Sequence, residues 1–175
     1  MLGLYTQSKL GLELASKQQK SSGISFEYIR GLVDGEGSFS FCNIPVTKSH
    51  EGQVKKFLLP AFILSMHARD KDLLMLVKNK LKLKNRIYEY RSTPLHMYNK
   101  SYKRGNKAIL IVRDFPALKN VIVPLFYGKL QGYKRIQFHE WLERIGSDPM
   151  VVPKYKLIYR LHKNNYFVNN PKYDG

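Results

Sequence analysis

The sequence predicts an α+β protein in which helices cover one face of a largely antiparallel sheet. Apolar residues recur at intervals of three and four in four segments, which is typical of amphipathic helices. Segments that alternate between apolar and polar residues come in two adjacent pairs. Paired strands can join as hairpins, whereas single strands alternating with helices would favour a parallel sheet. Each pair of strands is followed by an aspartate that can begin the next helix.

The predicted order is helix, two strands, helix, two strands, helix, helix. Ser25 is a good N-cap for the first helix, and Asp70 and Asp114 are placed to cap the second and third. The predicted helices span residues 26–34, 71–81, 115–124 and 130–145, and the predicted strands span residues 38–44, 55–67, 86–91 and 107–112.

Three parts are expected along the chain. Residues 1–24 form a basic leader or linker, residues 25–146 a folded domain, and residues 147–175 a basic, aromatic extension. The extension could run along a phosphate backbone or fold back on the domain, and the sequence leaves both open. Within the domain, residues 92–106 form a long loop of interleaved tyrosines and cations, which is typical of a functional loop.

Composition narrows the class of partner. The 30 Lys and Arg against 13 Asp and Glu give a formal net charge of +17, which favours a polyanion such as nucleic acid. The hydrophobic share of 43% argues against a disordered basic tail. No stretch is long and apolar enough for a membrane span, so no membrane partner is expected. Cys42 is the only cysteine, which excludes an intrachain disulfide and indicates an intracellular protein.

The segment from Ile29 to Gly37 combines two features at one helix end. Gly31 and Gly35 are four residues apart, so they form a smooth helix face that another backbone can approach closely. Glu36 follows, at the end where the last backbone carbonyls of the helix have no partner. A carboxylate beside carbonyl oxygens suits a hard divalent cation. The simpler alternative is an ordinary helix C-cap with the glutamate in solvent.

This segment resembles the motif of the LAGLIDADG homing endonucleases, with Arg30 at the alanine position and Glu36 at the final acidic position. Residues 62–71, 114–118 and 124–130 are also similar to segments of that family, so the resemblance covers roughly residues 25–145. It implies an αββαββα fold whose sheet forms a saddle on double-stranded DNA. Because the chain has one motif, it implies a homodimer that recognises a pseudo-palindromic site of about 20 base pairs.

The resemblance also implies Mg2+-dependent (or Mn2+-dependent) hydrolysis of phosphodiester bonds that leaves short 3′ overhangs. Glu36 and the Gly35 carbonyl would hold the metal, and Lys129 would be the basic active-site residue. Several relatives carry Gln where this chain has Met66, and the neighbouring His67 is the candidate to organise water instead. The expected dimer interface comprises Ile29, Gly31, Leu32 and Gly35.

Outward strand residues are the expected DNA contacts. Arg86 and Arg113 are candidates for guanine, Lys107 for guanine or phosphate, and the apolar members for thymine methyl groups or groove shape alone. The full set is Ser38, Ser40, Cys42, Ile44, Ala61, Ile63, Ser65, Arg86, Tyr88, Tyr90, Lys107, Ile109, Ile111 and Arg113.

The main alternative is a maturase that binds its own intron RNA and assists splicing without cleaving DNA. The charge and the aromatic residues suit RNA equally well, whereas Glu36 favours cleavage because a maturase need not keep a metal ligand. The expected location is intracellular: a mitochondrion or chloroplast if the chain is encoded by an organelle intron, and otherwise the cytoplasm.

Overall fold

The computed structural model describes residues 23–45, 56–91 and 105–173 of the chain. The predicted leader up to residue 22, the tip of the first hairpin and most of the predicted loop 92–106 lie outside the described residues. No helix in the described ranges is long and apolar enough to cross a membrane.

The four strands form one antiparallel sheet in the order β1-β2-β4-β3. The strands are β1 (Gly37–Pro45), β2 (Lys56–His67), β3 (Ile87–Tyr90) and β4 (Lys107–Val112). Both sequence-adjacent pairs are hairpin partners, and β2 pairs with β4 in the centre. The predicted α+β class and element order are confirmed.

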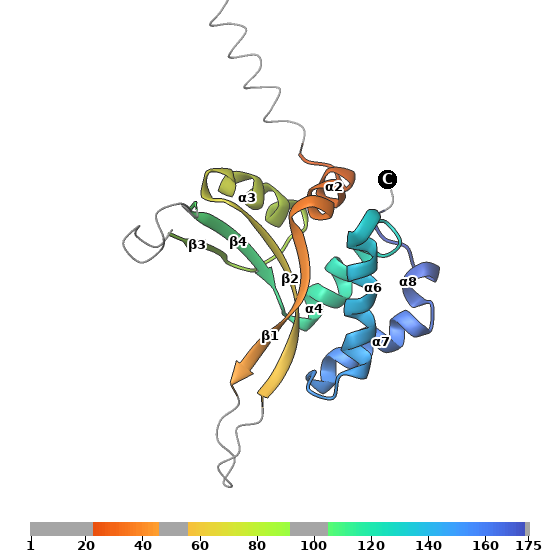
Figure 1. The fold of residues 1–175 in the computed structure, drawn as a ribbon. Coiled ribbons are helices and arrows are strands. Elements are labelled where there is room, and N and C mark those ends of the chain that lie inside the picture. Colours follow the sequence, from red (N-terminus) through yellow and green to blue (C-terminus); the bar gives the residue numbers. More distant parts are fainter. Residues whose placement is uncertain (1–22, 46–55, 92–104, 174–175) are drawn as a thin grey trace, which may run out of the picture.

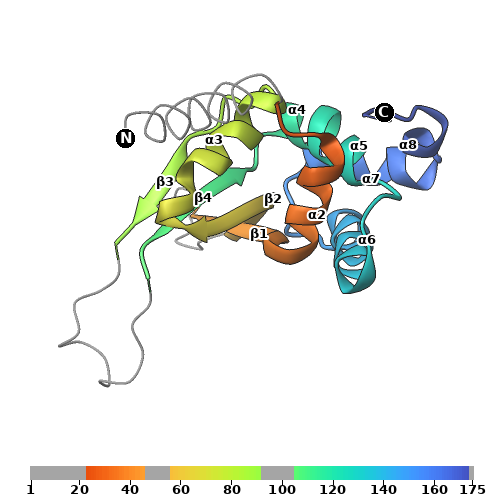
Figure 2. The ribbon, with the colours of Figure 1, turned by 90° about the horizontal axis from the view of Figure 1, so that it is seen from above.

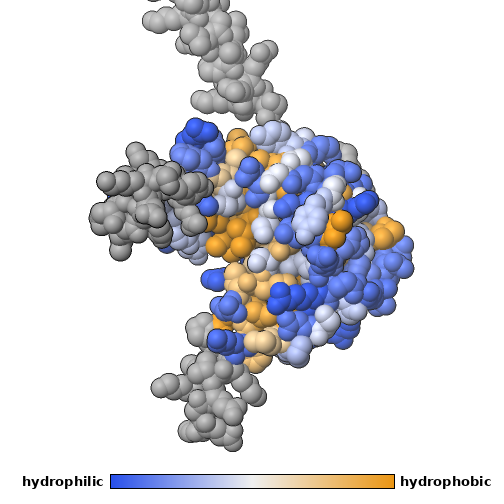
Figure 3. Space-filling view, viewed as in Figure 1, coloured by the Kyte–Doolittle hydropathy of each residue, from blue (hydrophilic) through white to orange (hydrophobic). Residues whose placement is uncertain are grey.

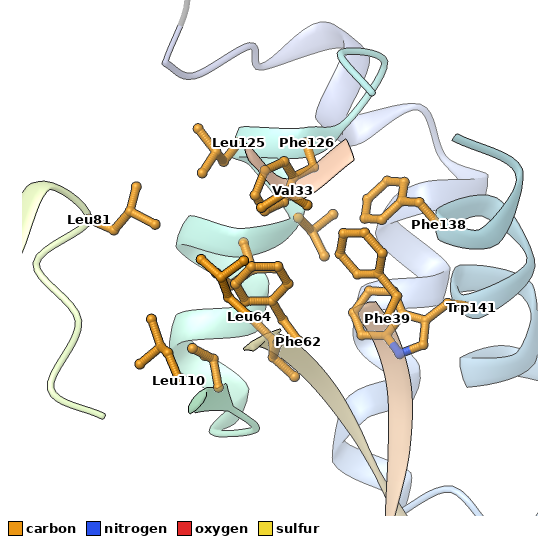
Figure 4. Close-up of a cluster of buried hydrophobic side chains, with 14 of the residues drawn as sticks. Val33, Phe39, Phe62, Leu64, Leu81, Leu110, Leu125, Phe126, Phe138 and Trp141 are labelled. Atoms are coloured by element: carbon orange, nitrogen blue, oxygen red, sulfur yellow. The ribbon is translucent and has the colours of Figure 1, made fainter. Parts of the chain in front are cut away.

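Helices cover one face of this curved sheet (Figure 1). In Figure 2 the helices α2 (Phe26–Glu36) and α3 (Lys71–Lys80) lie over the strands. The long helix α6 (Gly132–Ser147) completes this layer. Phe39, Phe62, Leu64 and Leu110 point from the strands into the core between the layers (Figure 4). The opposite face of the sheet carries none of these helices and is called the open face below.

Two helix boundaries differ from the prediction for identifiable reasons. The predicted helix 115–124 is α4 (Phe115–Ala117), a π turn over Leu118–Ile122 and α5 (Val123–Phe126). Pro124 has no N–H and would clash with the carbonyl four residues earlier, and the wider π turn in front of it relieves that clash. Asp70 makes no capping bond, because the chain is already helical from Ala68 and the imidazole of His67 accepts the first amide.

The edge strand β1 is covered by side chains of α6. Trp141 Nε1 donates to the carbonyl of Ser40 at 2.9 Å, and Lys134 Nζ donates to the carbonyl of Gly37. The guanidinium of Arg144 lies over the Phe41 ring, 4.5 Å from its centroid. These contacts fix the start of β1 against α6.

The C-terminal segment folds back on the domain. Val151 forms a parallel bridge to Leu58 of β2, beyond the end of β4. The Tyr155 hydroxyl donates to the carbonyl of Arg113 at 2.6 Å, and burial raises the pKa of this phenol, which keeps the donor protonated. The helices α7 (Lys156–Lys163) and α8 (Tyr166–Asn169) bury Ile158 and Phe167 in the same core. Of the two alternatives for this segment, the structure therefore has the folded-back one.

Candidate nucleic-acid interface and catalytic site

Glu36 is the last residue of α2 and is exposed at the junction with β1. The helix begins at the Ser25 hydroxyl, which accepts the Tyr28 amide at 3.0 Å, and it ends where the Gly37 amide bonds to the Val33 carbonyl. A Cβ on Gly37 would lie 2.5 Å from Val33 Cγ1 and 2.8 Å from the Val33 carbonyl oxygen. Only glycine allows this tight exit, so the glutamate is fixed at one point between helix and strand.

Lys134 lies next to this junction and was not among the predicted site residues. Its Nζ donates to the carbonyl of Gly37 and to Oε1 of Gln137 at 3.2 Å. The same turn is tied to α2 through the Gln131 amide, which donates to Asp34 Oδ1 at 3.0 Å. An ammonium group is therefore held one residue from Glu36.

A signal for Lys134 was present in the sequence. It precedes the buried Phe138 by four residues and Trp141 by seven, so it lies on the buried stripe of α6. A cation at such a position must either reach water or find an acceptor. Here the acceptor is the carbonyl of Gly37.

The two other predicted catalytic residues are exposed. Lys129 lies in the turn after α5, where Gly128 adopts a left-handed φ of +69°. The backbone amide of Lys129 donates to the Phe126 carbonyl at 3.1 Å. His67 ends β2 on the open face, opposite Lys107, and its Nδ1 accepts the Arg69 amide at 3.2 Å. Met66 lies on the other face and packs against the core, so it is His67 that faces outward at this strand end.

A divalent cation would find only part of a site in one chain. Among the described residues no three His, Cys, Asp or Glu side chains gather to hold a metal. Glu36 and the carbonyls at the end of α2 are oxygen donors of the type Mg2+ accepts, and Mg2+ often completes its shell with water and substrate phosphate. The carboxylate of Glu36 and these carbonyls therefore fit Mg2+ as part of its ligand set.

The helix α2 has a buried side and a bare side. Gly31 and Gly35 are exposed, and a Cβ on either would meet nothing within 4 Å. Leu32 is partly buried. Ile29 is completely buried in its own core, so its predicted place in a subunit interface is wrong.

Arg30 is the one buried charged side chain among the described residues. Its Nε donates to the Leu125 carbonyl at 3.0 Å and its Nη2 to the Tyr173 carbonyl at 2.8 Å, while Nη1 pairs with Glu27 at 3.0 Å. Arginine at the alanine position of the motif therefore joins α2 to α5 and to the last described residue of the chain.

The strand register places on the open face those predicted DNA-contacting residues that lie within the strands. Residues paired directly across antiparallel strands share a face. Ala61, however, is completely buried beside Ser40 and offers no surface, which corrects its inclusion in the predicted set. The pairs are Ser38–Ile63, Ser40–Ala61, Cys42–Leu59, Ile44–Phe57, Ile63–Ile111, Ser65–Ile109, Ile109–Tyr88, Lys107–Tyr90 and His67–Lys107.

A hollow of about 600 Å3 lies on this face. Arg86 and Arg113, two of the predicted DNA-contacting cations, line this hollow. The single acid is engaged, because Asp114 accepts from Asn85 Nδ2 at 2.9 Å and from the Ala117 amide at 3.1 Å. The residues that line the hollow are Leu59, Asn85, Arg86, Tyr88, Tyr90, Ile111, Arg113, Asp114 and Tyr155. The last of these comes from the C-terminal segment.

Solved structures of homing endonucleases share this fold. The I-LtrWI LAGLIDADG homing endonuclease bound to target DNA is 29% identical, with a TM-score of 0.52 over 69% of this chain and 36% of that chain. The meganuclease I-SmaMI bound to uncleaveable DNA is 21% identical, with a TM-score of 0.55 over 83% of this chain and 41% of that one. The homing endonuclease I-TnaI is 18% identical, with a TM-score of 0.53 over 83% and 79%.

This chain thus spans well under half of I-LtrWI and I-SmaMI and most of I-TnaI. No curated protein sequence matches it. A family model described as LAGLIDADG endonuclease matches residues 29–145, which is most of the described fold from α2 to α6. The chain belongs to the LAGLIDADG endonuclease family.

Proposed function

We propose that this chain is one subunit of a homodimeric, site-specific DNA endonuclease that uses Mg2+ or Mn2+. The observation that carries the proposal is the junction at Gly37, where an exposed glutamate, a lysine ammonium and a bare glycine face lie together. A helix cap alone would require neither the lysine nor the open glycine face.

The open face supports DNA as the substrate. It is a curved surface that none of the described helices covers, and it carries Arg86, Lys107 and Arg113 in a chain of net charge +17. A twisted antiparallel sheet can enter the major groove, where base edges are distinguishable. Two such faces related by a twofold axis would read a pseudo-palindrome of about 20 base pairs.

The bare face of α2 supports the dimer. Two helices can approach closely where glycines face each other, and a closed pair with twofold symmetry uses the same patch on both chains. The approach would bring two copies of Glu36 to one axis and complete the partial cation site.

The chemistry is hydrolysis of a phosphodiester bond. Water adds to phosphorus, the bond to the 3′-oxygen breaks, and the products are a 3′-hydroxyl and a 5′-phosphate on short 3′ overhangs. A bound divalent cation supplies charge neutralisation and a more acidic water. Glu36 and the Gly35 carbonyl would hold that cation, Lys134 would stabilise negative charge on the phosphate, and His67 would orient water through Nε2.

Replacement of Glu36 by glutamine tests the metal assignment. Glu36→Gln should lower cleavage of a selected DNA site in Mg2+ by at least about a hundredfold, because it removes the charge that holds the cation. DNA affinity without Mg2+ should stay unchanged. Glu140→Gln, which neutralises an exposed carboxylate on α6, is the matched control and should cleave normally. Full activity of Glu36→Gln would refute the assignment, and tight RNA binding with no DNA cleavage by the wild type would indicate a maturase.

The two candidate lysines can be compared directly. Lys134→Met should reduce the single-turnover cleavage rate by about 10² to 10³, since it removes a cation placed beside the reacting phosphate. Lys129→Met should have the smaller effect, because Lys129 lies five residues before Lys134, in the turn outside α6. Single-turnover rates with saturating enzyme separate chemistry from binding. A larger loss for Lys129→Met would return the active-site role to that residue.

Substitutions at Gly31 separate folding from dimerisation. Gly31→Ala should raise the free energy of unfolding of the isolated subunit by about 1 kcal/mol, because alanine favours the helix. Gly31→Leu should fold, since nothing occupies the space around its Cβ, yet give a light-scattering mass near the 20.4 kDa chain instead of twice that mass. Asn79→Leu, an exposed change on α3, is the control. A dimeric Gly31→Leu protein would exclude this face as the interface.

A further inference from the structure

The C-terminal segment returns to the motif helix α2 after α8. The carbonyl of Tyr173, the last described residue, accepts Nη2 of Arg30 at 2.8 Å across 143 residues of sequence. The Tyr173 ring packs edge-on against the ring of Phe26, with the two centroids 4.9 Å apart. Lys80 of α3 places its ammonium group 4.7 Å from the centroid of the same Phe26 ring. The first half of α2 is therefore in contact with both α3 and the C-terminal segment.

The backbone of Tyr173 has an unfavourable conformation. Its φ is +63°, in the left-handed region that residues with a Cβ seldom adopt. Such a conformation persists where the surrounding contacts stabilise it. The contacts here are the guanidinium of Arg30 at the carbonyl and the Phe26 ring at the side chain. The conformation of residue 173 thus depends on α2.

Arg30 joins three parts of the chain through different atoms of one rigid group. Nε donates to the carbonyl of Leu125 near the end of α5, Nη2 donates to the carbonyl of Tyr173, and Nη1 pairs with Glu27 on α2 itself. Because a guanidinium is planar, the directions of these donors are fixed relative to one another. Alanine, the residue of the family motif at this position, favours a helix more and buries no charge. Formation of α2 alone therefore does not account for the arginine.

The C-terminal helices make their main apolar contacts inward. Ile158 of α7 and Phe167 of α8 are buried in the core of the domain. Figure 3 shows mainly hydrophilic surface where α6, α7 and α8 lie, with apolar residues in isolated places. A site for a protein partner is more often a broad apolar patch. The described contacts therefore favour a role of this segment inside the subunit.

We propose that Arg30 is a positioning residue through which the C-terminal segment holds α2 in the orientation that cleavage requires, an inference that rests on the proposed endonuclease function. The contacts at Gly37 fix only one end of α2, and Arg30 lies about 10 Å earlier along the helix. In a dimer built on the bare face of α2, a tilt of the helix would change the separation of the two Glu36 carboxylates. A displacement of about 1 Å can lower a rate about a hundredfold.

Hydrogen exchange tests the connection without any measurement of activity. The amides of Asn169 and Asn170 are hydrogen-bonded at the end of α8. In Arg30→Met, which keeps an apolar stem in the core, these amides should exchange about tenfold faster, because the segment has lost its contact with α2. Arg160→Met, an exposed change on α7, is the matched control and should exchange like the wild type. Unchanged exchange in Arg30→Met would overturn the proposal.

Kinetics test whether the connection positions the site. Because Arg30 lies in the helix layer and not on the open face, Arg30→Met should lower kcat about tenfold and leave KM for a selected DNA site unchanged. Arg30→Lys keeps the charge but has one nitrogen in place of the planar fork, so it should also lose rate. Arg160→Met should cleave normally.

A second variant tests the other partner of the contact. Tyr173→Ala, which removes the ring from Phe26, should also lower kcat at unchanged KM. The loss in Arg30→Met/Tyr173→Ala should be smaller than the product of the two single losses, since both variants break one connection. Tyr173 is only partly buried, so this variant keeps the test decisive should Arg30→Met fail to fold.

The contradicting results are distinct from failure of the endonuclease proposal. Wild-type kcat in Arg30→Lys, or a raised KM at unchanged kcat in Tyr173→Ala, would overturn the positioning role and leave the endonuclease proposal standing. Failure of the wild-type chain to cleave any DNA site would contradict the endonuclease proposal, whereas the exchange rates would still decide whether Arg30 holds the C-terminal segment.

Discussion

The structure depends on one crowded junction, where α2 ends and β1 begins. Gly37 has no room for a Cβ against Val33, and its carbonyl accepts the ammonium group of Lys134. These two constraints fix the angle between the motif helix and the edge strand of the sheet. They also place Glu36, because a residue between a fixed helix and a fixed strand has little conformational freedom. The fold and the candidate catalytic site therefore share the same few contacts.

The motif helix has two opposite roles on its two sides. Ile29 and Val33 are completely buried in the core, while Gly31 and Gly35 present bare backbone to the outside. Arg30 binds the Leu125 and Tyr173 carbonyls and so attaches α5 and the C-terminal segment to the same helix. One side of α2 is packed in the core, and its other side is bare. Such a helix is suited to pack against α2 of a second subunit, since the core holds it in position.

The sequence predicted the fold well because its signals are local. Alternation along 38–44 and 107–112 and helical spacing along 71–81 depend on which side of one element faces the core, and the structure has those faces as predicted. The prediction that Ala61 is an exposed DNA contact was wrong because its burial depends on the neighbouring strands and not on its own strand. The prediction that Ile29 lies in the dimer interface was wrong because the resemblance identifies the interface helix but not the side of that helix that packs in the core.

The candidate site was predictable only in part. Glu36 follows from the motif, but Lys134 contacts the neighbouring Gly37 across 97 residues of sequence, and the helical pattern around Lys134 does not say which acceptor it meets. The same holds for Tyr155, which reaches the open face from a segment whose packing the sequence left open. Side chains that meet through tertiary packing need the fold before they can be assigned.

The central claim is that each chain carries half of a catalytic centre. It is tested most directly by mixing wild-type and Glu36→Gln subunits, co-refolded at constant total concentration, and measuring the rate of double-strand cleavage. If both halves are needed, the rate should follow the square of the wild-type fraction and fall to about a quarter when the subunits are present equally. A rate that falls in linear proportion to the wild-type fraction would contradict the account, because each chain would then act alone.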